Sequence, residues 1–256
     1  MLTDSHAHLT SRDMLAQLPS ILERAEAAQI GRIINICTDV QSLEDGIDLH
    51  ERYPWIDNAG ATTPHDVDRD GDKAFAAFAE AARRGQLVAI GETGLEYFHK
   101  HSKKEIQQEF LIRYLHLASE CRLPVIFHCR DAFDDLFAIA DREYPKGLPA
   151  LMHCFTGGLE NAKRAVERGW MISFSGILTY KNSPALREVA RWVPLEFLLI
   201  ETDTPYLAPL SKRGHPNEPA YLVETARCLA TIKEMPLDQM AQITTDNAQR
   251  MFRLRG

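Results

Sequence analysis

The sequence has few cysteines and no uninterrupted apolar run of the roughly 18 residues that a membrane-spanning helix requires. Its five cysteines are an odd number without a C-x-x-C pair, so we expect buried thiols that stay reduced. The first residues, Met1–His6, have neither the cationic nor the apolar region of a signal peptide. We therefore expect a cytoplasmic protein without a membrane anchor. The oligomeric state stays open, and a monomer is compatible with the sequence.

The chain also lacks an excess of basic residues. Against 36 Asp and Glu it has 29 Lys and Arg, a net charge of −7. This balance argues against a broad surface that binds nucleic acid phosphates, so any polyanion must be held locally. Neither G-x-G-x-x-G nor G-x-x-x-x-G-K-[ST] occurs, which argues against an open nucleotide-binding sheet.

What the sequence does contain is a regular alternation of apolar strand patterns and helical patterns over its 256 residues. The expected strands are Met1–Asp4, Arg32–Cys37, Ile56–Ala61, Leu87–Gly91, Leu123–Phe127, Pro149–Met152, Met171–Phe174 and Phe197–Ile200. The expected helices are Met14–Ala28, Leu43–Arg52, Lys73–Arg84, Ile106–Ser119, Phe133–Tyr144, Asn161–Arg168 and Ala185–Trp192. Eight such units predict an α/β fold, a single (β/α)8 TIM barrel over residues 1–256 that need not be regular. The tail Ala220–Phe252, interrupted at Pro236, predicts one or two extra C-terminal helices.

Residue types that bind metals follow five of the eight expected strands. These residues are His6 and His8, Glu92, His128, His153, and Glu201 with Asp203. In a barrel, the carboxyl ends of all strands meet at one open face, where active sites form. A single His or Glu at a strand end is usually structural, but this number of them on one face predicts a metal site.

The spacing divides these residues into ligands and supporting groups. His6 and His8 project to the same side of a strand and can bind one cation together. Asp4, on that same side, and Glu201 could each accept a hydrogen bond from a liganding imidazole and fix its tautomer. Four imidazoles and two carboxylates exceed the needs of one tetrahedral ion and match two ions. The simplest division assigns His6, His8 and Asp203 to one ion, His128 and His153 to the other, and Glu92 as the bridge.

Five ordered motifs connect these residues to a known family. They are Asp4-x-His6-x-His8, Gly91-Glu92-x-Gly94-Leu95, Pro124-Val125-x-x-His128-x-Arg130, His153-Cys154-Phe155-x-Gly157 and Glu201-Thr202-Asp203-x-Pro205-Tyr206-Leu207-x-Pro209 followed by Asn217-Glu218-Pro219. In this order, over nearly the whole chain, they closely resemble the TatD family of metal-dependent deoxyribonucleases. The resemblance implies an amidohydrolase-like TIM barrel, a divalent-metal site and hydrolysis of DNA phosphodiesters. Some members digest DNA from 3′ to 5′, so strand ends or single strands are the expected partner.

Two positions depart from the family pattern. The family usually has Asp after Gly-Leu, where this chain has Glu96, and it often has His where this chain has Thr63 before Pro64-His65. We interpret both as positions that touch substrate, not metal. His65 and Arg130 are expected to contact phosphate, although a loop histidine such as His65 is equally often a solvated surface residue.

For the reaction, the hypothesis is that the ions acidify a water and polarise the phosphoryl oxygens while Asp203 acts as general base. The metal stays open, because histidine ligands favour Zn²⁺ or Mn²⁺ whereas the family's nuclease activity implies Mg²⁺. Two alternatives remain at this stage. One is a hydrolase of a small amide, ester or lactone on the same fold, and the other is a non-catalytic metal-binding protein.

Overall fold

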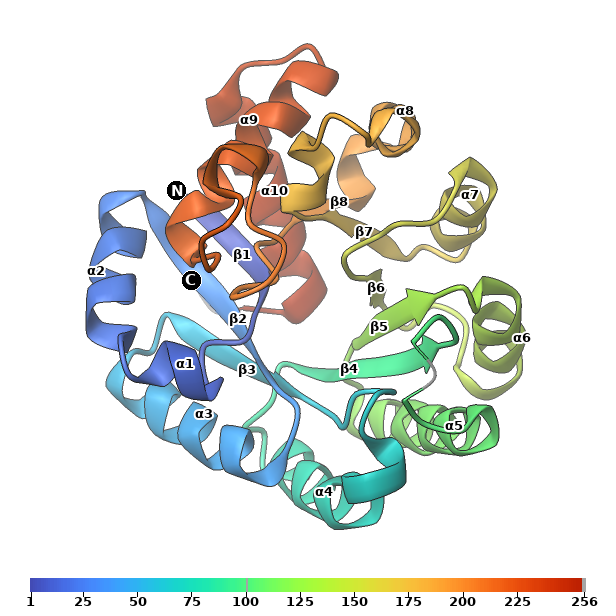
Figure 1. The fold of residues 1–256 in the computed structure, drawn as a ribbon. Coiled ribbons are helices and arrows are strands. Elements are labelled where there is room, and N and C mark those ends of the chain that lie inside the picture. The colour runs from blue at the N-terminus through green and yellow to red at the C-terminus, as the bar shows by residue number, and fades with distance from the viewer. Residues whose placement is uncertain (100, 255–256) are drawn as a thin grey trace.

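The computed structural model describes residues 1–99 and 101–254 and contains an eight-stranded parallel sheet enclosed by helices (Figure 1). The strands are β1 (Leu2–Ala7), β2 (Ile30–Cys37), β3 (Ile56–Gly60), β4 (Ala89–Glu96), β5 (Val125–Arg130), β6 (Ala150–Met152), β7 (Met171–Phe174) and β8 (Leu198–Ile200). They follow one another in chain order around the sheet, and each pair is parallel. The predicted (β/α)8 barrel is confirmed.

Helices connect the strands and continue beyond the last one. The α-helices are α1 (Arg12–Leu15), α2 (Leu18–Ala27), α3 (Val40–Arg52), α4 (Val67–Arg83), α5 (Lys104–Cys121), α6 (Phe133–Glu143), α7 (Leu159–Glu167), α8 (Pro184–Trp192), α9 (Leu222–Ile232) and α10 (Leu237–Phe252). Short 3₁₀ helices are η1 (Gly176–Thr179), η2 (Leu195–Phe197), η3 (Leu210–Lys212) and η4 (Pro219–Tyr221). No helix of the described residues is long and apolar enough to cross a membrane.

The barrel closes where β1 meets the end of β8. Ala7 forms an isolated parallel bridge with Thr204, and the Ser5 hydroxyl donates to the Ile200 carbonyl oxygen at 3.0 Å. The His8 amide donates to the Thr204 carbonyl at 2.8 Å. These bonds bring the first strand and the segment after the last strand side by side.

Three expected elements differ from the structure. The segment Met14–Ala28 contains two helices, α1 and α2, because Pro19 lies in the first turn of α2 and its ring favours a helix start. Strands β1 and β4 extend beyond their apolar runs through polar residues that are nonetheless buried. The tail, by contrast, forms two α-helices as expected, and Pro236, the expected break, is the N-cap of α10.

The core has two parts, one outside the barrel and one inside. The larger part packs the outer side of the strands against the helices. The smaller part fills the barrel interior with inward-facing strand residues and with Ala248, Met251 and Phe252 of α10. Helix α10 thus closes one end of the barrel, and the loops after the strands surround the other end.

Candidate metal centre

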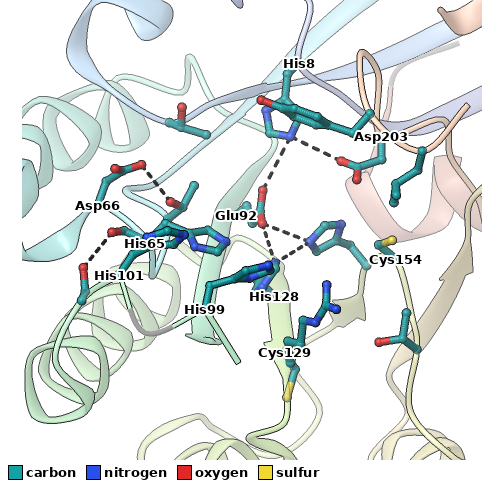
Figure 2. A pocket seen from close by; sticks show the side chains of 18 of the residues that line it. His8, His65, Asp66, Glu92, His99, His101, His128, Cys129, Cys154 and Asp203 are labelled. Atoms are coloured by element: carbon teal, nitrogen blue, oxygen red, sulfur yellow. Dashed lines mark hydrogen bonds and ion pairs between the residues drawn. The ribbon is translucent and has the colours of Figure 1, made fainter. Parts of the chain in front are cut away.

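The structure brings the six expected metal-ligand residues together at the open end of the barrel. Figure 2 labels His8, Glu92, His128 and Asp203 among them. The six residues come from β1, β4 and β5 and from the segments that follow β1, β6 and β8. Most of them line a cavity of about 830 Å³, and His6 lies buried directly beneath it. The residues are His6, His8, Glu92, His128, His153 and Asp203.

One group of donor atoms surrounds the Oε2 atom of Glu92. The Nε2 atoms of His6 and His8 lie 3.5 and 3.7 Å from this oxygen and 3.3 Å from each other. The Oδ1 atom of Asp203 is 3.7 Å from His6 Nε2 and 3.5 Å from His8 Nε2. Two imidazoles and two carboxylates therefore converge on one small volume.

A second group surrounds the other carboxylate oxygen of Glu92. The Nδ1 atom of His128 is 2.7 Å and the Nε2 atom of His153 is 3.2 Å from Glu92 Oε1. These two imidazole nitrogens are 3.3 Å apart. Glu92 thus lies between two sets of donors, with one oxygen directed at each set.

The chemistry of both groups fits divalent cations. Among the described residues, the ion-pair partners of Glu92 are all histidines, so no lysine or arginine there neutralises this buried carboxylate. Neutral imidazole nitrogen and carboxylate oxygen are the donors that Zn²⁺, Mn²⁺ and related ions prefer. A bound cation would supply the positive charge that this cluster lacks.

The close packing of carboxylates and imidazoles shifts their pKa values. Burial alone would raise the pKa of Glu92, but the imidazoles of His153, His128 and His6 hold this pKa well below its usual range. Burial alone would lower the pKa of His153, yet the carboxylates of Glu92 and Glu201 raise it well above its usual value. Burial lowers the pKa of His6, and the nearby His153 lowers it further.

Two backbone features hold these groups in place. Gly94 has φ 151°, and a Cβ at this position would lie 1.9 Å from the His128 carbonyl oxygen, so only glycine lets β4 approach β5 here. Asp203 has φ 58°, a left-handed conformation that Asp tolerates better than most residues. Its amide donates to the His6 carbonyl at 2.9 Å, which fixes the carboxylate beside β1.

Glu201 has the contact that the sequence predicts for it, whereas Asp4 does not. Glu201 Oε1 is 3.4 Å from His153 Nδ1 and accepts the Cys154 amide at 2.6 Å, and its Oε2 accepts the Ser173 hydroxyl. Asp4 instead accepts the Thr202 amide at 2.9 Å, the Thr202 hydroxyl at 2.6 Å and the His6 amide at 3.3 Å. Among the described residues, no imidazole donates to Asp4, whose hydrogen bonds instead join β1 to the segment after β8. Burial raises the pKa of Asp4 to about 7 against these hydrogen bonds.

The positions that the sequence associates with substrate fall into two classes. His65, Arg130 and Thr63 line the cavity. Glu96 does not: its side chain is almost fully buried, and its Oε2 atom lies 3.3 Å from His128 Nε2. The interpretation of Glu96 as a substrate contact is therefore wrong, because this side chain faces the far side of a metal-ligand candidate.

Three further residues line the cavity although the sequence motifs assign none of them a metal or phosphate contact. Tyr206 is 58% exposed, and its ring meets the His8 ring edge-on at 5.8 Å. His99 and His101 line the cavity beside His65. In a strand, the i, i+2 spacing of His99 and His101 would place both side chains on one face. These residues lie in a loop, where the spacing does not predict the direction of the side chains.

Comparison with known proteins agrees with this geometry. The family model described as TatD related DNase matches residues 3–253. The uncharacterized metal-dependent hydrolase YabD of Bacillus subtilis is 37% identical, over 99% of this chain and 100% of its own length. The 3'-5' ssDNA/RNA exonuclease TatD of Citrobacter rodentium is 32% identical, over 97% of each chain. The crystal structure of YjjV, a TatD homolog from Escherichia coli K12, has a TM-score of 0.93 and 30% identity, and covers 99% of this chain and 98% of its own. The resemblance in the sequence motifs is thereby confirmed, and this chain belongs to the TatD family of metal-dependent hydrolases.

Proposed function

We propose that this chain is a nuclease that hydrolyses the phosphodiester bonds of single-stranded DNA, working from the 3′ end, at a centre of two divalent ions. The strongest support is the position of Glu92, whose two oxygens face two separate donor sets. His6, His8 and Asp203 would hold one ion and His128 and His153 the other, with Glu92 between the two sets of ligands. Such a pair of ions supplies positive charge for the phosphoryl oxygens and acidifies a water.

Asp203 is the general base in this proposal. Its side chain keeps a small exposed fraction, 12%, on the cavity side, whereas His6 is fully buried. The Asp203 carboxylate accepts the proton of the attacking water, and the hydrogen bond from the Asp203 amide to the His6 carbonyl holds this residue beside β1.

The cavity wall carries groups suited to a single nucleic acid strand. The Arg130 guanidinium lies 4.4 Å from the centre of the Phe98 ring, and Phe98 is 55% exposed. Arg130 contacts phosphate, and the exposed rings of Phe98 and Tyr206 stack on unpaired bases. A site that accepts one strand end needs no basic surface, which reconciles this function with a net charge of −7.

The test is a metal-stripped enzyme supplied with Mg²⁺, Mn²⁺ or Zn²⁺ separately and given 5′-labelled single- and double-stranded DNA. We expect metal-dependent shortening of the single strand from its 3′ end. The Asp203→Asn variant should lose this activity. The matched Glu160→Gln variant should retain it, because Glu160 is exposed on α7, where it pairs with Lys163.

Cleavage of neither DNA form with any of these metals would contradict the nuclease proposal. If the same preparations hydrolysed a panel of amides, esters or lactones, the alternative reaction on the same fold would replace it. If no substrate were hydrolysed while metal bound tightly, a non-catalytic metal protein would remain.

A further inference from the structure

We propose that His65, His99 and His101, with Glu96 beneath them, form a further cation site for a transition ion such as Zn²⁺, separate from the Glu92-bridged centre. Figure 2 shows these three imidazoles gathered on one side of the cavity. His65 comes from the loop after β3, and His99 and His101 come from the loop after β4. One nitrogen of each ring lies within 4.8 Å of the others.

The rings face one another as a compact group. The ring centroid of His65 is 5.9 Å from that of His99 and 5.3 Å from that of His101. The rings of His99 and His101 are nearly parallel, with centroids 5.6 Å apart. Three imidazoles at this separation repel when protonated, whereas a cation between their lone pairs holds them together.

A buried carboxylate lies beside two of the three imidazoles, those of His65 and His99. Glu96 Oε1 accepts the backbone amides of Phe98 at 2.7 Å and His99 at 3.0 Å. The other oxygen, Oε2, is 3.3 Å from His99 Nδ1 and 3.9 Å from His65 Nε2, and it also forms a hydrogen bond with His128 Nε2. Three nitrogens and one carboxylate oxygen are a donor set typical of zinc.

Hydrogen bonds between the two loops fix the site. The Ser102 hydroxyl donates to the His65 carbonyl at 2.8 Å. The buried Gln107 amide donates to the Ser102 and Glu96 carbonyls at 2.9 and 3.0 Å and accepts the Glu96 amide at 2.8 Å. The loops therefore hold the three histidines near one another before any ion binds.

Glu96 also joins this group to the first centre. The same Oε2 atom lies 3.3 Å from Nε2 of His128, whose Nδ1 faces Glu92. The family's usual Asp at this position has a side chain shorter by one methylene. The longer Glu96 brings a carboxylate oxygen to the histidines on both sides.

Metal stoichiometry tests the proposal without reference to activity. Untagged, chelator-stripped protein would be titrated with Co²⁺ and with Zn²⁺, freed of excess ion by gel filtration and analysed by elemental mass spectrometry. We expect the His99→Ala/His101→Ala variant to bind one ion per chain fewer than the wild type and to lose one component of the Co²⁺ absorption spectrum. A matched His116→Ala variant should bind as many ions as the wild type, because His116 is an exposed histidine paired with Glu143.

A second variant separates this site from the proposed nuclease centre. Glu92→Gln should lose the ions of the bridged centre and keep the ion at His65, His99 and His101. Equal metal content in wild type and His99→Ala/His101→Ala would overturn the further site and leave the nuclease proposal standing. An unchanged metal content combined with a raised KM for DNA would assign these histidines to direct substrate contact, which also overturns it. A further ion in a protein that cleaves no DNA would leave this site standing and remove the nuclease proposal.

Discussion

The two ends of the barrel interior are lined by the same inward faces of the strands, but one end is apolar and the other carries imidazoles and carboxylates. On β5, Ile126 points into the apolar interior and His128, two residues later, reaches the metal centre. The same change occurs at β6, where Leu151 points into the apolar interior and His153, just after the strand, reaches the metal centre. At the closed end these faces meet α10, and at the open end they meet the cavity.

This difference shows how the fold separates stability from chemistry. The closed end buries apolar side chains from several strands and from α10, which stabilises the folded state. The open end buries carboxylates and imidazoles that face one another without lysine or arginine partners among the described residues, an arrangement that is costly until a cation binds. Substitutions at the two ends should therefore affect different properties.

The largest effect is expected at the open end from Glu92→Gln. Loss of the carboxylate charge removes the group that faces both donor sets, so metal content should fall and kcat/KM should drop at least about 10³-fold. The metal-free variant should unfold within a few degrees of the metal-free wild type. Scanning calorimetry, elemental analysis and kinetics measure these three properties. Full metal content with full activity would contradict the bridging role.

At the closed end, Phe252→Ala should affect stability instead. Phe252 is 2% exposed and packs into the barrel interior. Truncating such a ring costs about 3–5 kcal/mol, measurable as a lower denaturant midpoint. Metal content and kcat of the folded protein should stay within about twofold of the wild type. The matched Phe98→Ala variant should cost under about 1 kcal/mol, because Phe98 is mostly exposed. A strong loss of kcat in folded Phe252→Ala would break the separation between the two ends.

The sequence predicts most of the metal-ligand positions at the open end. Their positions at or just after the carboxyl ends of β5, β6 and β8 correctly place His128, His153 and Asp203 at one end of the barrel, because parallel strands of a barrel end at the same face. The strand around Glu92 is less regular, because the pairing of β4 with β5 shifts register between Ile90 and Thr93. The hydrophobic periodicity of the sequence does not reveal this shift.

Residues whose contacts depend on loops could not be placed from sequence. Asp4 bonds Thr202 across 198 positions of the chain, a partner known only after the barrel closes. The placement of His99 and His101 beside His65 depends on hydrogen bonds between two loops, including that of Ser102 to His65. Glu96 follows a family motif by position, but only the fold shows that its carboxylate turns inward to His128.

A smaller effect at the open end is expected from Glu201→Gln. Glu201 Oε1 lies 3.4 Å from His153 Nδ1, whereas Glu92 faces the other nitrogen of this ring, Nε2. Removing this charge should weaken metal binding about 10- to 100-fold, because the carboxylate no longer stabilises the required imidazole orientation. Chelator-competition titration measures the affinity, and saturating metal should restore most of the activity. Ser173→Ala, which removes a donor to Glu201 but leaves its charge, is the matched control and should change the affinity less. Unchanged affinity in Glu201→Gln would assign Glu201 a structural role only.

The smallest effect is expected at the outer edge of the open end, from Phe98→Ala and Tyr206→Ala. Their rings are 55% and 58% exposed beside the cavity, so each ring can stack on one base. Such a stacking contact contributes about 1 kcal/mol, the low end of the usual range. The KM for single-stranded DNA should rise about fivefold in each variant. Hydrolysis of bis(4-nitrophenyl) phosphate, which carries no base, should not change. DNA with an abasic 3′-terminal region should show no difference between variant and wild type, because the missing base removes the contact that the ring makes. Equal losses on all three substrates would contradict the stacking role. They would mean that these rings affect the metal centre itself, although they lie at the outer edge of the cavity.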